Sequence, residues 1–225
     1  MTNFPEPLNK VSTRDFAYNE IKKKIITGEW APDEPIVEER VASKLKISRT
    51  PLREALQRLE IEELVTRQMN GRLKVASISI QEVKEIFTVR SKLEGIIAIQ
   101  ATEHATERDI LHLSTLTTMI KETFKQDHIE DILYYGGKFH SYLYDLSENK
   151  TVVKILNQLN DHIHRYRRLI PLRNIDRLEK SVKEHERILN CIAQKDKDGA
   201  ALAMEAHIQN SLEAAINSIK NDQQD

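Results

Sequence analysis

The sequence predicts a mainly α-helical protein that folds in two parts. Apolar residues recur every three or four positions along most of its 225 residues, which is the spacing of amphipathic helices. The pair Asn70-Gly71 separates two short segments of β-forming residues, a pattern typical of a hairpin. Only 6 Gly and 6 Pro are present, too few for a many-turned β protein. We therefore expect three helices and one β-hairpin, followed by an all-helical bundle.

The N-terminal part is predicted to begin with three helices. Thr13 is the expected N-cap of the first helix, and Gly28 its expected end, because glycine is common just after a helix. Residues 31–35 are predicted to form a turn. Ser48 is the expected N-cap of the third helix, and Pro51 fits its first turn. The three helices are expected at about residues 13–27, 37–45 and 49–62.

A β-hairpin is expected directly after the third helix. Its strands are predicted at residues 64–67 and 73–76, with Asn70-Gly71 at the tip. Three helices and a hairpin in fewer than 80 residues make a winged helix-turn-helix, a fold whose second and third helices dock on DNA. We therefore expect residues 10–78 to form such a domain.

The pattern is helical throughout the rest of the chain. Ser79 is the expected N-cap of the first of these helices, with Glu82 three residues later as in a capping box. Gly136 and Gly137 interrupt a helix, where each costs ~1 kcal/mol relative to Ala, so they mark a weak point, a close helix contact or a cavity wall. Short connections favour an antiparallel six-helix bundle over residues 79–222. Its helices are expected at about residues 80–104, 107–126, 128–148, 150–169, 175–194 and 197–220.

Composition narrows the class of protein. The chain holds 34 basic and 35 acidic side chains, so its net charge is −1, yet the segment 40–74 carries nine Lys/Arg against four acids. A basic segment in a neutral protein indicates a local anionic partner, although a solvated helical face is the plainer alternative. The one cysteine, Cys191, fits a reducing cytoplasm. No apolar run approaches the ~20 residues of a membrane span, and no secretory signal is visible, so we expect a cytoplasmic protein.

The start of the third helix has the chemistry of a DNA-reading surface. Arg49 and Arg53 lie four residues apart on one helix face, and an arginine pairs bidentately with guanine. Ser48 and Thr50 offer hydroxyl groups to phosphate at a helix N-terminus. The hairpin tip, with Arg67 and Arg72 beside it, would approach the adjacent minor groove.

The segment from Ala17 to Val75 resembles the DNA-binding domain of GntR-family bacterial transcription regulators. By this resemblance Arg49, Thr50 and Arg53 contact DNA, and Asn70 and Gly71 form the tip of the wing. Glu63 stands where family members usually have Gly. The residues that carry the resemblance are Ala17-Tyr18, Ile21, Ile25, Gly28, Pro32, Glu39, Ala42, Leu45, Ser48 to Leu56, Leu59-Glu60, Leu64-Val65 and Gly71.

The bundle, about residues 80–222, resembles the FadR-type C-terminal effector domain (FCD), and its six helices resemble the VanR-like subgroup. Many such domains bind a divalent metal through one Asp and three His, and a small carboxylate effector completes the coordination. The three His match His140, His185 and His207, but Gly136 occupies the position of the Asp. The resemblance rests on residues 89–94, Phe139-His140 with Asn149, Glu184-His185 with Ile188-Leu189, Asp196, Ala200-Ala201, Met204 and His207-Ile208.

Three hypotheses for this site remain open. The three His hold Zn or Ni, with water or effector in the open positions. Alternatively, Asp131 or Tyr135 replaces the missing Asp. Or no metal binds, and the histidines form an anion pocket with Arg90, whose guanidinium pairs well with a carboxylate. The plainer role for Arg90 is a salt bridge to Glu94 one turn on.

These observations predict a ligand-responsive bacterial transcription factor. We expect a homodimeric repressor that binds a short palindromic double-stranded operator and responds to a small organic acid. The alternative from another class is a metal-dependent hydrolase that uses the three-His site. We expect no enzyme, because no nucleophile motif, Walker loop or dinucleotide-binding glycine pattern is present. A helical scaffold without a ligand would leave costly buried histidines unexplained.

Overall fold

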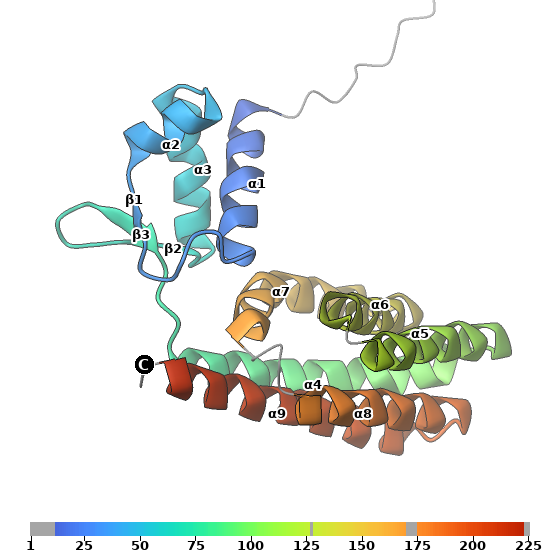
Figure 1. Ribbon diagram of the computed structural model, residues 1–225. Helices are drawn as coiled ribbons and strands as arrows, with labels where there is room; N and C mark the ends of the chain where they lie inside the picture. Colours follow the sequence, from blue (N-terminus) through green and yellow to red (C-terminus); the bar gives the residue numbers. More distant parts are fainter. Residues whose placement is uncertain (1–11, 127, 170–174, 223–225) are drawn as a thin grey trace, which may run out of the picture. The chain divides into compact units, whose positions relative to one another are not determined.

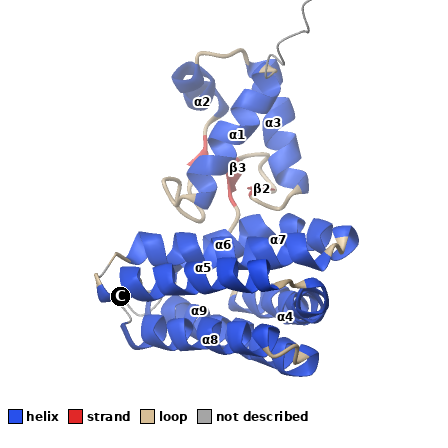
Figure 2. Cartoon of the chain, turned by 90° about the vertical axis from the view of Figure 1, so that its right-hand side faces the viewer, coloured by secondary structure: helices blue, strands red, loops and turns tan. Residues whose placement is uncertain are grey.

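A computed structural model describes residues 12–126, 128–169 and 175–222. The chain divides into two compact units, with the division between Ile78 and Ser79. The first unit contains helices and short strands, whereas the described part of the second contains helices joined by short loops (Figure 2). The mainly α-helical class, the winged helix-turn-helix and the helical C-terminal part are thereby confirmed.

The described part of the first unit contains three helices and a small sheet. The helices are α1 (Thr13–Ile26), α2 (Glu38–Leu45) and α3 (Arg49–Ile61). The strands are β1 (Pro35–Ile36), β2 (Val65–Arg67) and β3 (Leu73–Val75), and their order in the sheet is β1-β3-β2 with both pairings antiparallel. The hairpin β2–β3 was expected, but β1 was not. Pro35 and Ile36 pair with Lys74 and Leu73, so the predicted turn at 31–35 ends in a strand.

The helix ends of the first unit differ from prediction in two places. Ser12, not Thr13, caps α1, because its Oγ accepts a hydrogen bond of 3.0 Å from the backbone N–H of Asp15. Ser48 is the N-cap of α3, as expected, but its side chain makes no capping hydrogen bond. Gly28 adopts a φ of 69° just after α1, a backbone conformation that favours glycine.

The core of the first unit lies between α1, α3 and the sheet. Leu52, Ala55, Leu56 and Leu59 face inward from α3 and are at most 1% exposed. They belong to one apolar cluster with α1 and the inner residues of the strands. Because this stripe anchors α3, the opposite face of the helix is left in solvent.

The second unit is a helical bundle. Its described helices are α4 (Ile80–His104), α5 (Glu107–Lys125), α6 (Ile129–Ser147), α7 (Lys150–Leu169), α8 (Ile175–Ala193) and α9 (Lys197–Asp222). The expected ranges agree with these bounds to within two residues. Helix α4 packs against α9, α6 and α7, and α5 packs against α6 and α8 (Figure 1). Among the described residues, no helix has the length and apolar content required to cross a membrane.

Two helix starts of the bundle carry informative caps. The Ser79 Oγ accepts from the Glu82 backbone N–H at 3.0 Å, as expected for the start of α4. The Glu82 carboxylate does not complete the predicted capping box but accepts from the Tyr166 hydroxyl at 2.6 Å. A complete capping box starts α5 instead, between Thr106 and Asp109.

Candidate functional site

The first turn of α3 presents its polar side chains to solvent. Ser48, Arg49, Thr50 and Arg53 are all exposed. Glu39 accepts a hydrogen bond from Arg49 at 3.1 Å, and Glu38 accepts one from Arg53 at 2.8 Å. Such exposed ion pairs are weak, so phosphate or base groups would displace the two glutamates readily. Two arginines at a helix N-terminus are suited to binding an anionic polymer.

The tip of the β2–β3 hairpin is also exposed. Gly71 has a φ of 79°, and no atom lies within 4 Å of the place where its Cβ would be. The Asn70 side-chain oxygen accepts from the backbone N–H of Arg72 at 3.0 Å, which holds the turn closed. Arg67 donates to the carbonyl of Gly71 at 3.3 Å. The six residues expected to contact DNA therefore lie on two solvent-facing features of the first unit.

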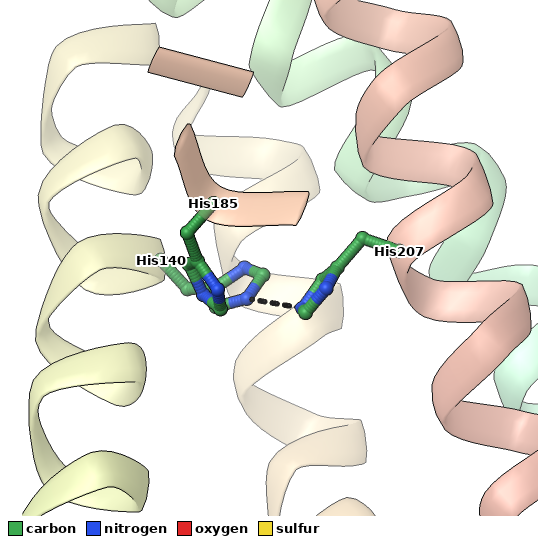
Figure 3. Close-up of side chains that lie close together, drawn as sticks. All are labelled: His140, His185 and His207. Atoms are coloured by element: carbon green, nitrogen blue, oxygen red, sulfur yellow. Dashed lines mark hydrogen bonds between the residues drawn. The ribbon is translucent and has the colours of Figure 1, made fainter. Parts of the chain in front are cut away.

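Three histidines meet inside the second unit. His140 extends from α6, His185 from α8 and His207 from α9 (Figure 3). They are 4%, 3% and 2% exposed, and one nitrogen of each lies within 4.8 Å of the others. The Nε2 atoms of His140 and His207 are 3.3 Å apart, the contact that Figure 3 marks with a dashed line. The three histidines named from the sequence are thus brought together by the fold.

The opposite ring nitrogen, Nδ1, faces a hydrogen-bond acceptor in each histidine. In His140 it lies 3.0 Å from Glu94 Oε2, and in His207 it lies 2.6 Å from Glu184 Oε2. In His185 it donates to the backbone carbonyl of Ser181 at 2.7 Å. Each ring that donates through Nδ1 has a lone pair on Nε2 when neutral. Lone pairs that face one another repel, and a cation between them removes the repulsion.

This donor set fits a transition-metal ion. Three neutral imidazoles with carboxylate or carbonyl partners on the far nitrogen are a common arrangement around zinc and related ions. The partners fix the tautomer and the ring orientation before a metal arrives. Among the described residues, the cluster offers three protein donors to a metal ion. The remaining coordination positions of such an ion would be open to water or an anionic ligand.

Glu94 links His140 to a buried arginine. Its Oε1 accepts two hydrogen bonds from Arg90, at 3.1 and 3.0 Å, and one from the Tyr144 hydroxyl at 2.7 Å. Burial disfavours the charged carboxylate, but His140, Arg90 and the donated hydrogen bonds outweigh it and hold the pKa of Glu94 well below its ordinary value. Glu94 is therefore an anion at neutral pH and a firm partner for His140.

Glu184 plays the corresponding part for His207. Its Oε2 also accepts from Arg177 at 3.0 Å, and its Oε1 accepts from the Asn210 amide at 2.7 Å. Glu184 directly precedes His185 on α8, and because α9 packs against α8 its carboxylate reaches His207.

Gly136 lies beside the ring of His185. A Cβ at this position would be 3.7 Å from His185 Nε2 and would meet no closer atom. A Cβ at position 136 would therefore fit beside the His185 ring in ordinary van der Waals contact. Asp131, one suggested substitute for the missing Asp, is not among the clustered residues, and its Oδ2 lies 3.6 Å from His128 Nδ1 instead. The ring of Tyr135 packs against that of Tyr134, and its role as a substitute stays a prediction.

A polar cavity of about 350 Å³ lies on the α7 side of His140. Arg90, His140 and Tyr144 line it together with Lys138, and Gly137 forms part of its wall. Arg90 is 3% exposed, and its second terminal nitrogen, Nη1, has no hydrogen-bond partner among the described residues. A buried guanidinium nitrogen without an acceptor favours an anionic ligand in this cavity. Arg90 thus makes both the expected salt bridge to Glu94 and part of a cavity wall.

Two partners of the site were missed by sequence reasoning. Tyr144 lies one helical turn after His140, and that spacing was a usable signal. Glu94 was considered only as a partner of Arg90, whereas it also holds His140 from 46 positions away in the sequence. Local residue spacing does not predict a contact between helices that are far apart in the sequence.

Comparison with known proteins decides the family. The profile described as "FCD domain" matches residues 85–210, and the one described as "Bacterial regulatory proteins, gntR family" matches residues 13–75. The chain belongs to the GntR family. It is a transcriptional regulator with a DNA-binding domain of that family and an FCD domain.

Relatives of this GntR regulator match along most of its length. It is 32% identical to the HTH-type transcriptional regulator YdhC of Bacillus subtilis, over 87% of this chain and 88% of that protein. It is 25% identical to the gluconate operon transcriptional repressor of Bacillus licheniformis, over 87% and 82%. The fold also matches that of McbR/YncC from E. coli, with a TM-score of 0.75, 22% identity and coverage of 92% and 99%. The two Bacillus relatives are named as a transcriptional regulator and a transcriptional repressor, so the hydrolase alternative has no support from them.

Proposed function

We propose that this GntR regulator is a homodimeric repressor whose affinity for a palindromic operator is controlled by a small organic acid. The observation that carries the proposal is the convergence of three buried imidazoles in the FCD domain. The name of the relative from Bacillus licheniformis, a repressor of a gluconate operon, supports both repression and an acid effector. The described six-helix bundle supports placement in the VanR-like subgroup.

The DNA-binding half of the proposal assigns six residues. Arg49 and Arg53 read bases in the major groove, while Ser48 and Thr50 contact phosphate. Asn70 and Gly71 bring the wing to the neighbouring minor groove. Exposure of all six side chains or backbones supports this assignment. Two such units related by a twofold axis match the symmetry of a palindrome.

The effector half assigns a divalent ion, Zn or Ni, to His140, His185 and His207. When bound, the ion supplies a Lewis-acidic centre that attracts a carboxylate. The protein's own residues do the rest. Glu94 and Glu184 orient two of the rings, and Arg90 on the cavity wall offers the ligand its Nη1, which has no hydrogen-bond partner among the described residues. A ligand that holds Arg90 acts directly on α4, whose first residue, Ile80, follows β3 by five positions.

Control of DNA affinity requires that the ligand prefer one arrangement of the protein. A ligand with equal affinity for two conformations shifts neither population. A ligand that contacts both Arg90 on α4 and the histidines on the other helices binds best at one distance between α4 and those helices. We expect this preference to alter how the two α3 helices of the dimer are presented to DNA.

Metal content is the decisive test of the effector half. The untagged protein, purified without chelator, should hold about one ion per chain by elemental analysis, as one site predicts. The His140→Ala variant should lose the ion, whereas the control His128→Ala should keep it, because His128 is exposed and outside the cluster. Absence of metal even after incubation with Zn or Ni would contradict the metal site and leave an anion pocket around Arg90.

Arg49→Ala tests the DNA-binding half. An operator is first selected from random double-stranded oligonucleotides with the wild-type protein. Loss of a bidentate guanine contact is expected to lower operator affinity at least about tenfold, measured by fluorescence anisotropy at several salt concentrations. Lys84→Ala, an exposed substitution on α4, is the matched control. An unchanged affinity in Arg49→Ala would refute the assignment of α3 as the reading helix.

A further inference from the structure

Helix α5 has a surface that no described element covers. Residues 110–120 contain no Asp, Glu, Lys or Arg, the longest such stretch in a chain that is 31% charged. On the inner side of the helix the lack of charge follows from packing in the core, because Leu113, Leu116 and Ile120 are buried. Packing does not account for the outer side, where Leu111 is 69% exposed and Met119 is 42% exposed.

The exposed residues form one stripe along the helix. Leu111, Thr115 and Thr118 follow at intervals of four and three, and Arg108 and Glu122 extend the same spacing at the two ends. This is the heptad spacing of helices that pack side by side. We call these five residues the α5 stripe. All five side chains are at least partly exposed.

The two threonines of the stripe use their hydroxyl groups in hydrogen bonds within α5. The hydroxyl of Thr115 donates to the carbonyl of Leu111 at 3.0 Å, and that of Thr118 donates to the carbonyl of Ser114 at 2.9 Å. With their hydrogens committed to the helix backbone, the two side chains can present methyl groups to a partner. The middle of the stripe is therefore a small, largely apolar contact surface without charge.

The charges at the ends of the stripe identify the partner. Arg108 and Glu122 each lie seven residues, or two helical turns, from Thr115. If a second α5 packs antiparallel around a twofold axis at Thr115, each Arg108 meets the Glu122 of the other copy. The apolar middle then meets itself. A surface that is complementary to its own copy under a twofold rotation is what a symmetric dimer requires.

We propose that the α5 stripe is the homodimer interface of this protein, with α5 antiparallel to the α5 of a second copy. A stable interface buries about 1,200–2,000 Å² in total, more than one stripe offers, so a neighbouring surface must contribute. A hollow of about 320 Å³ between α5 and α8 borders the stripe and is lined by Thr118, Lys121 and Leu189, among others. This proposal rests on the proposed dimeric repressor and assigns its contact surface.

Leu111→Glu tests the interface by placing a charge in its apolar part. Sedimentation equilibrium should show the wild type as a dimer, and the variant should dissociate at least about tenfold more readily, as expected for a buried interface charge. Leu202→Glu on α9 is the control, because Leu202 is an equally exposed leucine (65%) outside the stripe. Circular dichroism establishes that both variants are folded. A monomeric wild type, an unaffected Leu111→Glu dimer, or equal loss in Leu202→Glu would each overturn the proposal.

A charge exchange tests the antiparallel register. Arg108→Glu and Glu122→Arg should each weaken the dimer, because each places like charges opposite one another. The double variant restores opposite charges and should return the dimer dissociation constant to within about threefold of wild type. Additive weakening in the double variant would contradict this pairing.

Thr115→Cys tests the position of the twofold axis. In a Cys191→Ser background, the new cysteine would meet its own symmetry mate and form a disulfide between two copies under mild oxidation. Leu202→Cys in the same background should stay uncrosslinked. Failure of Thr115→Cys to crosslink would overturn the axis position. If all stripe variants behave like wild type while the protein still binds its selected operator as a dimer, the interface proposal fails and the repressor proposal stands.

Discussion

At the scale of single residues, Gly136 has the largest chemical consequence. A Cβ there would lie beside His185 Nε2, and with no side chain at this position the proposed metal site takes its donors from three imidazole rings and not from a carboxylate. A site with fewer protein anions leaves more positive charge on a bound ion, which an anionic effector would compensate. We therefore expect metal and carboxylate ligand to bind cooperatively at this site.

Gly136→Asp should raise metal affinity. An Asp side chain there would point from 3.7 Å away toward the ring nitrogen of His185 and would add a charged donor. We expect at least about tenfold tighter Zn binding, measured by competition with a chromogenic chelator. Lys84→Asp is the control, since Lys84 is exposed on α4 and does not belong to the histidine cluster. Equal affinities in the two variants would count against the proposed metal site.

At the scale of elements, the start of α5 is fixed by one carboxylate. Asp109 accepts from the Thr106 hydroxyl at 2.6 Å, the Tyr142 hydroxyl at 2.7 Å and the Thr106 backbone N–H at 2.8 Å. These hydrogen bonds, that from the Thr106 side chain first, lower the pKa of Asp109 to about 2. Because Tyr142 belongs to α6, the same carboxylate also ties α6 to α5.

The sign of the pH effect follows from this lowered pKa. The folded state holds the Asp109 proton less tightly than the unfolded state, so the contribution to stability is fully present above about pH 4 and is lost as pH falls toward 2. In Tyr142→Phe the pKa of Asp109 should rise from about 2 toward the ordinary aspartate value of 3.8, as followed by carbon-13 NMR of the carboxyl group. Tyr134→Phe, an exposed tyrosine on the same helix, should leave it unchanged. No rise in Tyr142→Phe would refute the role of this hydrogen bond.

At the scale of the whole molecule, regulation requires that binding in one unit alter the action of the other. The assigned DNA contacts lie in residues 48–71, and the histidine cluster lies in residues 140–207, on opposite sides of the division at Ile78. Coupling between two sites means that a ligand at one site changes the affinity of the other site for its own ligand, and the change is the same in both directions. Substitutions in the bundle should therefore separate DNA binding from its control.

His185→Ala should make this separation visible. We expect the variant to bind the selected operator within about threefold of wild type, because the coupling and not the DNA surface is removed. The carboxylate that releases wild-type protein from DNA should no longer do so, as measured by the same anisotropy assay. His128→Ala serves as the control and should respond normally. A normal effector response in His185→Ala would exclude the histidine cluster as the effector site.

Local patterns in the sequence located the helices and the hairpin but not every strand. Helix spacing located the six described helices of the bundle within two residues, and Asn70-Gly71 located the hairpin. Strand β1 was missed because two residues that pair with a distant strand carry no periodic signal of their own. The predicted capping box at Glu82 was wrong, because the Glu82 carboxylate accepts a hydrogen bond from Tyr166, which lies 84 residues away in the sequence.

Residue types at fixed spacings predicted the two-part helical architecture, and the resemblance to a known family pointed to the three histidines. The packing of the helices, in contrast, sets what surrounds these histidines. Glu94 faces His140 and Glu184 faces His207 because α4, α6, α8 and α9 pack in one bundle. Burial opposes the charge of Glu94, but His140, Arg90 and the donated hydrogen bonds keep it charged, and among the described residues Arg90 Nη1 has no hydrogen-bond partner. Such properties depend on which helices become neighbours in space, and local spacing does not specify that.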